Sequence, residues 1–345
     1  MKRIATILFL ISSMLLNGQE AQFSQYYAAS LYLNPGFSGI YNDASIHMNH
    51  KRQLQSVDVI NELTQVSFIF PIKPNGPYER SIGGAGIMAF NEKSGFRGVY
   101  ERSSIFANYA HNIKFGLLSA YLVSIGVQVG YELRKLDFSN LSWGSQYNPF
   151  FGYDNTLPIP VTEFNDQQNN IVVNAGIMYY FNPERNYLLH TYSGFLGISA
   201  TNLNRPNTSF TTDVESEAPM LFKYNGGIEF KFDKYFIMPS LLYLNLRNNH
   251  QFNAGLNVAY APGSGRYRAK GSQLLFGVWY RLRDSFILMG GVKMQSLIVR
   301  VSYDMNSTLF DPNRDIDLAQ NSMEISIQYS FSKNANARRA SNPLF

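Results

Sequence analysis

The chain has 345 residues, of which 45% are hydrophobic, 15% aromatic and only 15% charged, with a net charge of +5. A soluble domain usually carries about 25% charged residues, and because the basic residues form no stripe, the sequence does not support nucleic-acid binding. The absence of cysteine excludes disulfide scaffolds, cysteine-based metal sites and thiol catalysis.

The N-terminus has the pattern of an export signal. Lys2 and Arg3 form a basic start, residues 4–16 are mainly apolar, and Gly18 provides a small residue at a cleavage point. The apolar run is shorter than the roughly 20 residues of a membrane-spanning helix, which disfavours an uncleaved anchor. We therefore expect residues 1–18 to be a signal peptide.

Period-two alternation dominates the rest of the chain. In residues 121–134 the apolar face runs from Tyr121 to Leu133, and the opposite face carries Ser, Gly, Gln and Glu. The same pattern recurs at 252–260, 297–305 and 323–331. A soluble β-sandwich also alternates, but the length of these runs and their uncharged polar faces favour membrane strands with lipid outside.

The alternating segments predict an all-β, transmembrane antiparallel barrel of about 14 strands over residues 44–333, in the cell outer membrane and in contact with its lipid. The three longest links, 139–168, 203–218 and 309–320, all follow odd-numbered strands, so they share one end of the barrel. If the first strand runs outward, this is the extracellular end. The predicted strands are 44–54, 62–73, 81–92, 99–114, 119–138, 169–182, 187–202, 219–232, 235–247, 250–261, 272–283, 285–295, 297–308 and 321–333.

Two segments flank the predicted barrel: residues 19–43 before it, and a basic C-terminal tail at 334–345. Residues 19–43 contain aromatic side chains that are costly to expose, so we expect the segment to pack inside the barrel or beneath it, in a periplasmic or lumenal position. Its Asn34-Pro35-Gly36 motif favours a turn. The turn either belongs to an element that docks a partner or plugs the pore, or is a simple entry into the first strand.

Four charged side chains fall on predicted lumenal faces, either as a selectivity or docking surface or as paired charges inside a filled lumen. They are Glu132, Arg134, Arg300 and Asp304. Bulky inward residues such as Leu122, Tyr180 and Trp279 favour an occluded lumen, although fourteen strands alone would allow a narrow channel.

The longest loop, 139–168, is rich in aromatic residues, which suit either protein recognition or a cap folded over the barrel mouth; we favour the cap. Acidic and amide residues at 311–317 start like a calcium loop, but Ile316 replaces the required glycine, so we expect a solvated loop. The aromatic residues of the loop are Trp143, Tyr147, Phe150, Phe151 and Tyr153.

Catalytic and metal motifs are weak. His47 and His50 lie three apart on a strand, hence on opposite faces, and no nucleophile elbow or zinc helix is present. We therefore expect no enzyme, no cofactor and no metal site.

The segment before the barrel resembles a known family. Gln22-Phe23-Ser24-Gln25-Tyr26, followed by Leu33-Asn34-Pro35-Gly36-Phe37-Ser38-Gly39, is similar to the N-terminal box of the PorP/SprF family of the Bacteroidetes type IX secretion system. Gly36-Phe37-Ser38 departs from the usual Ala-Tyr-Ala of that box. Later segments resemble the family as well: 83–86, 174–181, 239–241, 301–304 and 322–327, with Met323 at the position of a usual histidine.

The resemblance implies a role in protein secretion or cell-surface anchoring, in some members for gliding motility. The implied partners are a secreted adhesin-like protein with a C-terminal secretion domain and type IX translocon components. Two alternatives remain: a passive channel or transporter for a small or lipophilic solute, and a structural barrel that stabilises a translocon. The family box suggests these partner-docking residues: Gln22, Phe23, Gln25, Tyr26, Asn34, Pro35 and Gly39.

Overall fold

The computed structural model describes residues 22–41, 43–54, 59–73, 81–116, 120–137, 144–148, 150–154, 156–157, 165–182, 192–211, 215–262, 272–306 and 321–331. Three predicted features lie outside these residues: the signal peptide at 1–18, the calcium-like stretch at 311–317 and the basic tail at 334–345.

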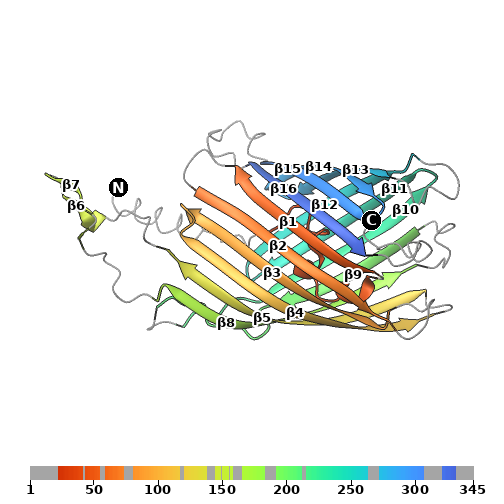
Figure 1. The fold of residues 1–345 in the computed structure, drawn as a ribbon, viewed down its shortest axis with the longest axis horizontal. Coiled ribbons are helices and arrows are strands. Elements are labelled where there is room, and N and C mark those ends of the chain that lie inside the picture. The colour runs from red at the N-terminus through yellow and green to blue at the C-terminus, as the bar shows by residue number, and fades with distance from the viewer. Residues whose placement is uncertain are drawn as a thin grey trace, which may run out of the picture.

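Fourteen antiparallel strands form one closed barrel, which confirms the predicted fold class and strand count (Figure 1). Each strand pairs with the next barrel strand along the chain, and β16 pairs with β1 to close the sheet. The strands are β1 Ala44–Leu54, β2 Val59–Ile72, β3 Gly83–Phe96, β4 Tyr100–Phe115, β5 Tyr121–Leu136, β8 Gln167–Phe181, β9 Tyr192–Thr201, β10 Leu221–Phe232, β11 Tyr235–Leu246, β12 Asn249–Tyr260, β13 Gln273–Arg281, β14 Ser285–Met294, β15 Leu297–Asn306 and β16 Asn321–Phe331.

Alternation along the strands separates a lumenal face from an outer face. On β5, Ser124 and Gln128 are buried in the lumen, whereas Ile125, Val127 and Tyr131 are 44–52% exposed on the outside. An apolar outer surface on a closed sheet is what a lipid bilayer requires, because every backbone polar group of the strands is paired within the sheet. Aromatic rings near the strand ends stack across neighbouring strands, as in the interfacial girdles of membrane barrels.

The two ends of the barrel differ. The links after β5, β9 and β15, residues 137–166, 202–220 and 307–320, all leave from one end, here called the loop end. The opposite turn end holds the tight connections at 233–234 and 295–296, and there β1 begins and β16 ends. The two short strands β6 Tyr147–Asn148 and β7 Gly152–Tyr153 form a separate hairpin in the first of the long links.

Residues 22–41, here called the plug, lie inside the barrel rather than in its wall (Figure 1, red). The plug starts at Gln22 in the loop-end half of the lumen, beside Lys51 near the end of β1. It passes through two four-residue helices, α2 Ser30–Leu33 and α3 Phe37–Ile40, and reaches the turn end, where β1 begins. The sheet therefore surrounds the residues that immediately precede it in sequence.

Within the described ranges, no helix is long and apolar enough to cross a membrane.

Candidate functional site

The backbone of the plug bends where its sequence requires it. Asn34 is extended, with φ −157° and ψ 123°, and it ends α2. The following Pro35 disfavours helical geometry at Asn34 and cannot donate a backbone hydrogen bond, so the helix stops there. The Asn34 side chain closes the turn, because its Oδ1 accepts a hydrogen bond of 2.8 Å from the Gly36 N–H.

Aromatic side chains anchor the plug to opposite walls of the lumen. Tyr26 and Tyr27 pack on Trp279 of β13, with ring centroids 5.3 and 5.4 Å apart. Phe23 meets Phe90 of β3 edge-on at 6.4 Å. Burial raises the pKa of the Tyr26 and Tyr27 hydroxyls above their usual range, so both stay neutral. The aromatic residues of the family box are therefore core residues of a filled barrel.

Lumenal side chains satisfy the backbone carbonyls of the plug. Helices as short as α2 and α3 leave most carbonyls without intrahelical partners, and an unpaired buried carbonyl is costly. Barrel side chains donate to these carbonyls instead, at 2.6–3.2 Å. The pairs are Lys223 to Tyr32, Ser199 to Leu33, Asn108 to Pro35, Ser124 to Gly36, and Asn112 to Gly39.

Asn34 also joins the plug to the barrel wall. Its Nδ2 donates to the carbonyls of Ile177 at 3.2 Å and Ile198 at 3.1 Å, which are paired residues on β8 and β9. With Oδ1 bonded to Gly36, the side-chain amide uses both N–H donors and its oxygen acceptor. Aspartate would keep the size of this side chain and lose both donors.

Two lumenal glycines let the plug approach the sheet closely. A Cβ on Gly126 of β5 would lie 2.5 Å from the Gly36 nitrogen, and one on Gly84 of β3 would collide with the carbonyl of Ser38. Real Cβ contacts are longer than this, so any larger residue would push the plug away from the wall. The Pro35-Gly36 turn therefore depends on barrel residues distant in sequence.

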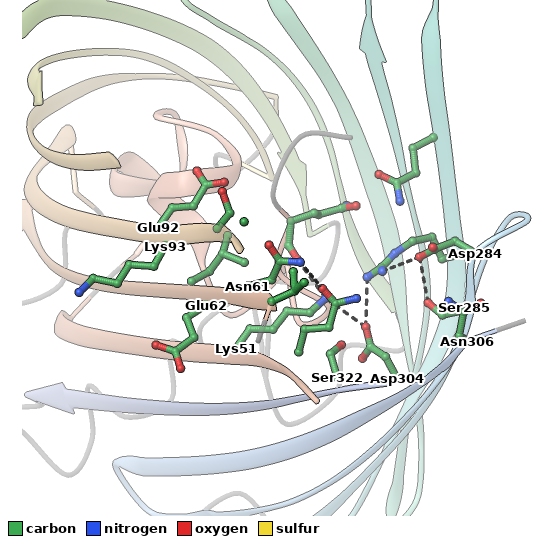
Figure 2. Close-up of a pocket in the computed structure, with 18 residues that line it drawn as sticks. Lys51, Asn61, Glu62, Glu92, Lys93, Asp284, Ser285, Asp304, Asn306 and Ser322 are labelled. Carbon is green, nitrogen blue, oxygen red and sulfur yellow. Dashed lines mark hydrogen bonds and ion pairs between the residues drawn. The ribbon is translucent and has the colours of Figure 1, made fainter. Parts of the chain in front are cut away.

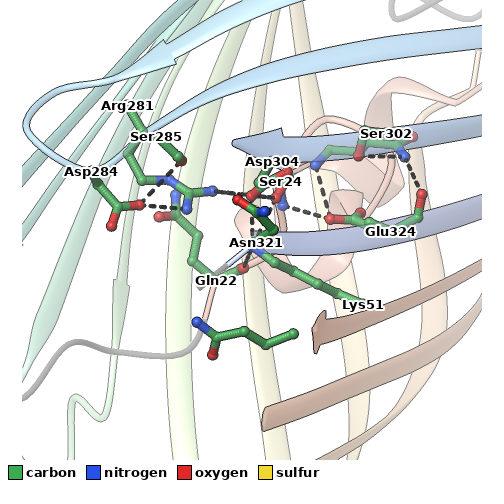
Figure 3. A network of polar contacts seen from close by, with 12 residues as sticks. Gln22, Ser24, Lys51, Arg281, Asp284, Ser285, Ser302, Asp304, Asn321 and Glu324 are labelled. Carbon is green, nitrogen blue, oxygen red and sulfur yellow. Dashed lines mark hydrogen bonds and ion pairs between the residues drawn. The ribbon is translucent and has the colours of Figure 1, made fainter. Parts of the chain in front are cut away.

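A charged network holds the start of the plug (Figure 3). Lys51 of β1 forms an ion pair of 3.1 Å with Asp304 of β15 and donates to Ser24 Oγ at 2.7 Å. Arg281 of β13 reaches the same carboxylate at 3.4 Å and pairs with Asp284 at 2.8 Å. Ser24 Oγ donates to Asp304. Charges from three strands thus converge on one serine of the plug.

A second set of contacts joins the plug to the last strand. Glu324 of β16 accepts hydrogen bonds from the backbone N–H of Ser24 at 2.6 Å and of Gln25 at 3.2 Å. The Gln25 amide donates to Ser302 of β15 at 3.1 Å and accepts from Ser326 of β16 at 2.7 Å. Since β16 pairs with β1, these contacts lie along the seam where the barrel closes.

The four predicted lumenal charges all lie on inward-facing strand positions, but in different surroundings. Glu132 and Arg134 pair with each other at 2.7 Å on β5. Asp304 belongs to the network around Ser24. Arg300 is buried in the turn-end half of the lumen without such a carboxylate partner among the described residues. The structure therefore does not bring the four together into one site.

The sequence interpretation missed Lys51, Arg281 and Glu324 as parts of this network. Period-two alternation could have found them, because each is a charged residue on the lumenal face of a predicted strand. Alternation shows which way a side chain points; it does not show that the three meet.

A cavity of about 430 Å³ lies between the start of the plug and the loop end (Figure 2). Its lining is mainly polar, and none of the described residues that line it is aromatic. Gln22 and Asp304 contribute to its wall, so the plug and its charged network close the cavity toward the turn end. The strand residues labelled in Figure 2 are Lys51, Asn61, Glu62, Glu92, Lys93, Ser285, Asp304, Asn306 and Ser322.

The aromatic residues of the longest loop do not all behave as predicted. Phe150 and Phe151 at the tip of the β6–β7 hairpin are 90% and 89% exposed, so the prediction that they cap the barrel mouth is wrong. The hairpin is fixed by its own contacts, including a hydrogen bond of 2.9 Å from the Phe150 N–H to Asn148 Oδ1. Its tip therefore presents two apolar rings to the surroundings. Trp143 lies outside the described residues.

The described residues contain no group of three or more His, Cys, Asp or Glu side chains placed to hold a metal ion. His47 is buried in the lumen beside Tyr41, and His50 is exposed on the outer face, as strand alternation predicted.

A closed antiparallel barrel with an apolar outer surface and a filled lumen defines this protein as an outer-membrane β-barrel. The family model described as type IX secretion system membrane protein PorP/SprF matches residues 15–329. The chain belongs to the PorP/SprF family, as its N-terminal box predicted.

A comparison with characterised proteins found no significant match in sequence. Solved structures with a similar arrangement of strands include the CymD monoaromatic hydrocarbon channel, at 11% identity and a TM-score of 0.48 over 91% of this chain and 95% of that one. A FadL homologue of Pseudomonas aeruginosa has 9% identity and a TM-score of 0.44, over 88% of this chain and 94% of that one. The toluene transporter TodX of Pseudomonas putida has 7% identity and a TM-score of 0.45, over 90% of this chain and 94% of that one. Similarity at this level does not indicate what the chain binds.

Proposed function

We propose that this barrel is a non-enzymatic docking platform of the type IX secretion system, which binds a secreted adhesin-like protein for export or surface anchoring, including in gliding motility. Membership of the PorP/SprF family supports the link to secretion. The observation that carries the docking role is the plug, because a lumen filled by residues 22–41 offers no path for a polypeptide. The cargo then binds to the barrel instead of passing through it.

The β6–β7 hairpin supports the location of the docking surface. Phe150 and Phe151 are exposed at its tip, and large exposed aromatic residues are favoured anchors of protein interfaces. Long loops of membrane barrels face the cell exterior, so the loop end is the side that meets a secreted protein. The same role in secretion implies that the barrel also binds components of the type IX translocon.

The principal alternative is a passive channel or transporter for a small or lipophilic solute. The cavity at the loop end would be its entrance, but the plug and the Lys51–Asp304 ion pair close the cavity on the side that faces the turn end. The described part of the cavity lining also has none of the aromatic residues that a lipophilic solute would favour. A structural barrel that only stabilises a translocon is the third candidate.

Two experiments separate these functions. Purified barrel in a planar bilayer should show no stable conductance if the lumen stays plugged, whereas stable channels would favour the solute pathway. In cells lacking the gene, surface proteomics should show a cargo with a C-terminal secretion domain missing from the cell surface. Unchanged export and retention of every such cargo would contradict the docking role, and loss of all cargo together would favour the structural barrel.

A further inference from the structure

Arg300 of β15 is the most deeply buried basic residue of the described lumenal wall, with 1% of its surface exposed. Its neighbours across the sheet are small, Gly291 of β14 and Ser326 of β16. A Cβ on Gly291 would lie 3.0 Å from the Cγ of Arg300, so the missing side chain makes room for the arginine stem. The sheet is thus built to place this guanidinium in the lumen.

The guanidinium has no counter-charge at ion-pair distance in the described part of the chain. Its Nε and Nη1 are buried and have no hydrogen-bond partner. By contrast, Arg281, Arg134 and Arg102 each pair with a carboxylate at 2.7–2.9 Å. Arg300 faces the ring of Tyr27 in the plug, 5.6 Å from the ring centroid. A ring face attracts a cation only modestly and accepts no strong hydrogen bond from it.

Loss of a proton does not remove this buried charge, because arginine remains protonated at any pH that proteins tolerate. An unpaired buried charge is among the most costly features of a folded protein. Either water or an ion must therefore meet the unpartnered N–H groups, and the surrounding charge decides between them.

Among the described residues, the inward-facing positions in the turn-end half of the lumen carry more positive than negative charge. Lys114, Lys231 and Lys293 occupy inward-facing strand positions there, together with Glu229. The carboxylate of Glu324, which lies diagonal to Arg300 across β15 and β16, is already bonded to the N–H groups of Ser24 and Gln25. Lys293 lies on β14, two positions beyond the residue paired with Arg300. Such a field draws anions into the site.

We infer that the lumen binds one small inorganic anion of the chloride type, held by the N–H groups of Arg300 between the barrel wall and Tyr27. The anion is small because Arg300 is enclosed by the plug and the sheet, which leaves no room for a nucleotide or a peptide. The ion neutralises Arg300 and so stabilises the packing of the plug against β15. This site is independent of the partner that the barrel docks.

Bromide is the direct probe of this site, because it replaces chloride and is visible by anomalous diffraction. Crystals of the detergent-solubilised mature barrel grown in sodium bromide should show an anomalous peak in contact with the Arg300 guanidinium. The same crystals of Arg300→Gln should lack that peak. Wild-type crystals with no peak at Arg300 would overturn the proposal.

Thermal unfolding in detergent gives a second readout, which does not require the variant to crystallise. Wild-type barrel should unfold at a higher temperature in chloride than in gluconate at equal ionic strength, since gluconate is too large for the site. Arg52→Gln, on the outer face, should keep this difference, whereas Arg300→Gln should lose it. Equal unfolding temperatures of the wild type in the two salts would also overturn the site, even if Arg300→Gln fails to fold.

Discussion

The backbone N–H of Ser24 donates a hydrogen bond of 2.6 Å to Oε2 of Glu324, so the first described residues of the plug are tied to the last strand of the barrel. The same oxygen accepts the N–H of Gln25. These bonds use backbone donors, which makes the attachment depend on the carboxylate of Glu324 and on the path of the plug, rather than on one plug side chain.

Replacing Glu324 by alanine should loosen the start of the plug. Two buried N–H groups would lose a charged acceptor, and hydrogen bonds to charged groups are worth about 2 kcal/mol each. We expect a lower unfolding temperature in detergent and faster proteolysis of the plug. Glu217→Ala is the matched control, because Glu217 is an exposed loop residue paired with Arg205 at 3.7 Å. Equal losses in both variants would contradict the role of Glu324.

Asn34→Asp should destabilise the barrel by about 2 kcal/mol although the side chain keeps its shape. The carboxylate would lose the bonds to the Ile177 and Ile198 carbonyls and would face their oxygens instead. Asn207→Asp provides the control, because the Asn207 Oδ1 accepts hydrogen bonds from two backbone N–H groups and aspartate can do the same. Unfolding in detergent should separate the two variants, and equal stability of Asn34→Asp and the wild type would refute this assignment.

Gly126→Ala should displace the Pro35-Gly36 turn from the wall. The added methyl group would overlap the plug backbone, and overpacking of this kind costs about 1–3 kcal/mol. Gly290→Ala is the control, since a Cβ there meets nothing within 4 Å on the outer face of β14. We expect a cysteine introduced at Ser38 to react with a maleimide faster in the Gly126→Ala background than in the Gly290→Ala background. Identical rates would show that the glycine is not needed for close approach.

A double substitution of Phe150 and Phe151 by serine should weaken partner binding without affecting the barrel. The two rings are exposed and make no core contact, so stability should change by less than about 0.5 kcal/mol. Loss of two aromatic anchors should lower affinity for the cargo at least tenfold, or about 1.4 kcal/mol. Surface proteomics of cells that carry the variant should show less retained cargo. Leu203→Ser, in another loop at the same end, controls for loop changes in general.

Much of the fold could be predicted because membrane strands have a strong period. The predicted strand at 235–247 corresponds to β11 Tyr235–Leu246, and that at 297–308 to β15 Leu297–Asn306. The boundaries were less accurate at the loop end, where β2 begins at Val59 instead of residue 62 and β3 continues to Phe96. The last part of β3 carries the polar residues Asn91 to Ser94, so hydrophobic alternation no longer marks the end of the strand.

The candidate site was much harder to predict. Ser24 and Gln25 meet their partners across about 280–300 positions of sequence, and no local pattern encodes which lumenal residue faces which plug residue. Local chemistry did identify the Asn34-Pro35-Gly36 turn, since proline and glycine restrict the backbone themselves. The aromatic hairpin was misjudged because composition alone does not distinguish rings that cover a barrel from rings that project away from it.

The attachment of Ser24 to Glu324 has a consequence for the assembly of the barrel. The plug precedes every barrel strand in sequence, whereas β15 and β16, which hold Ser24 and Gln25, are the last two strands. The contacts of Ser24 and Gln25 with these two strands can therefore form only after all the other barrel strands have been synthesised. Contacts of such long sequence separation form late in folding, so closure of the barrel and attachment of the start of the plug belong to one final step of folding.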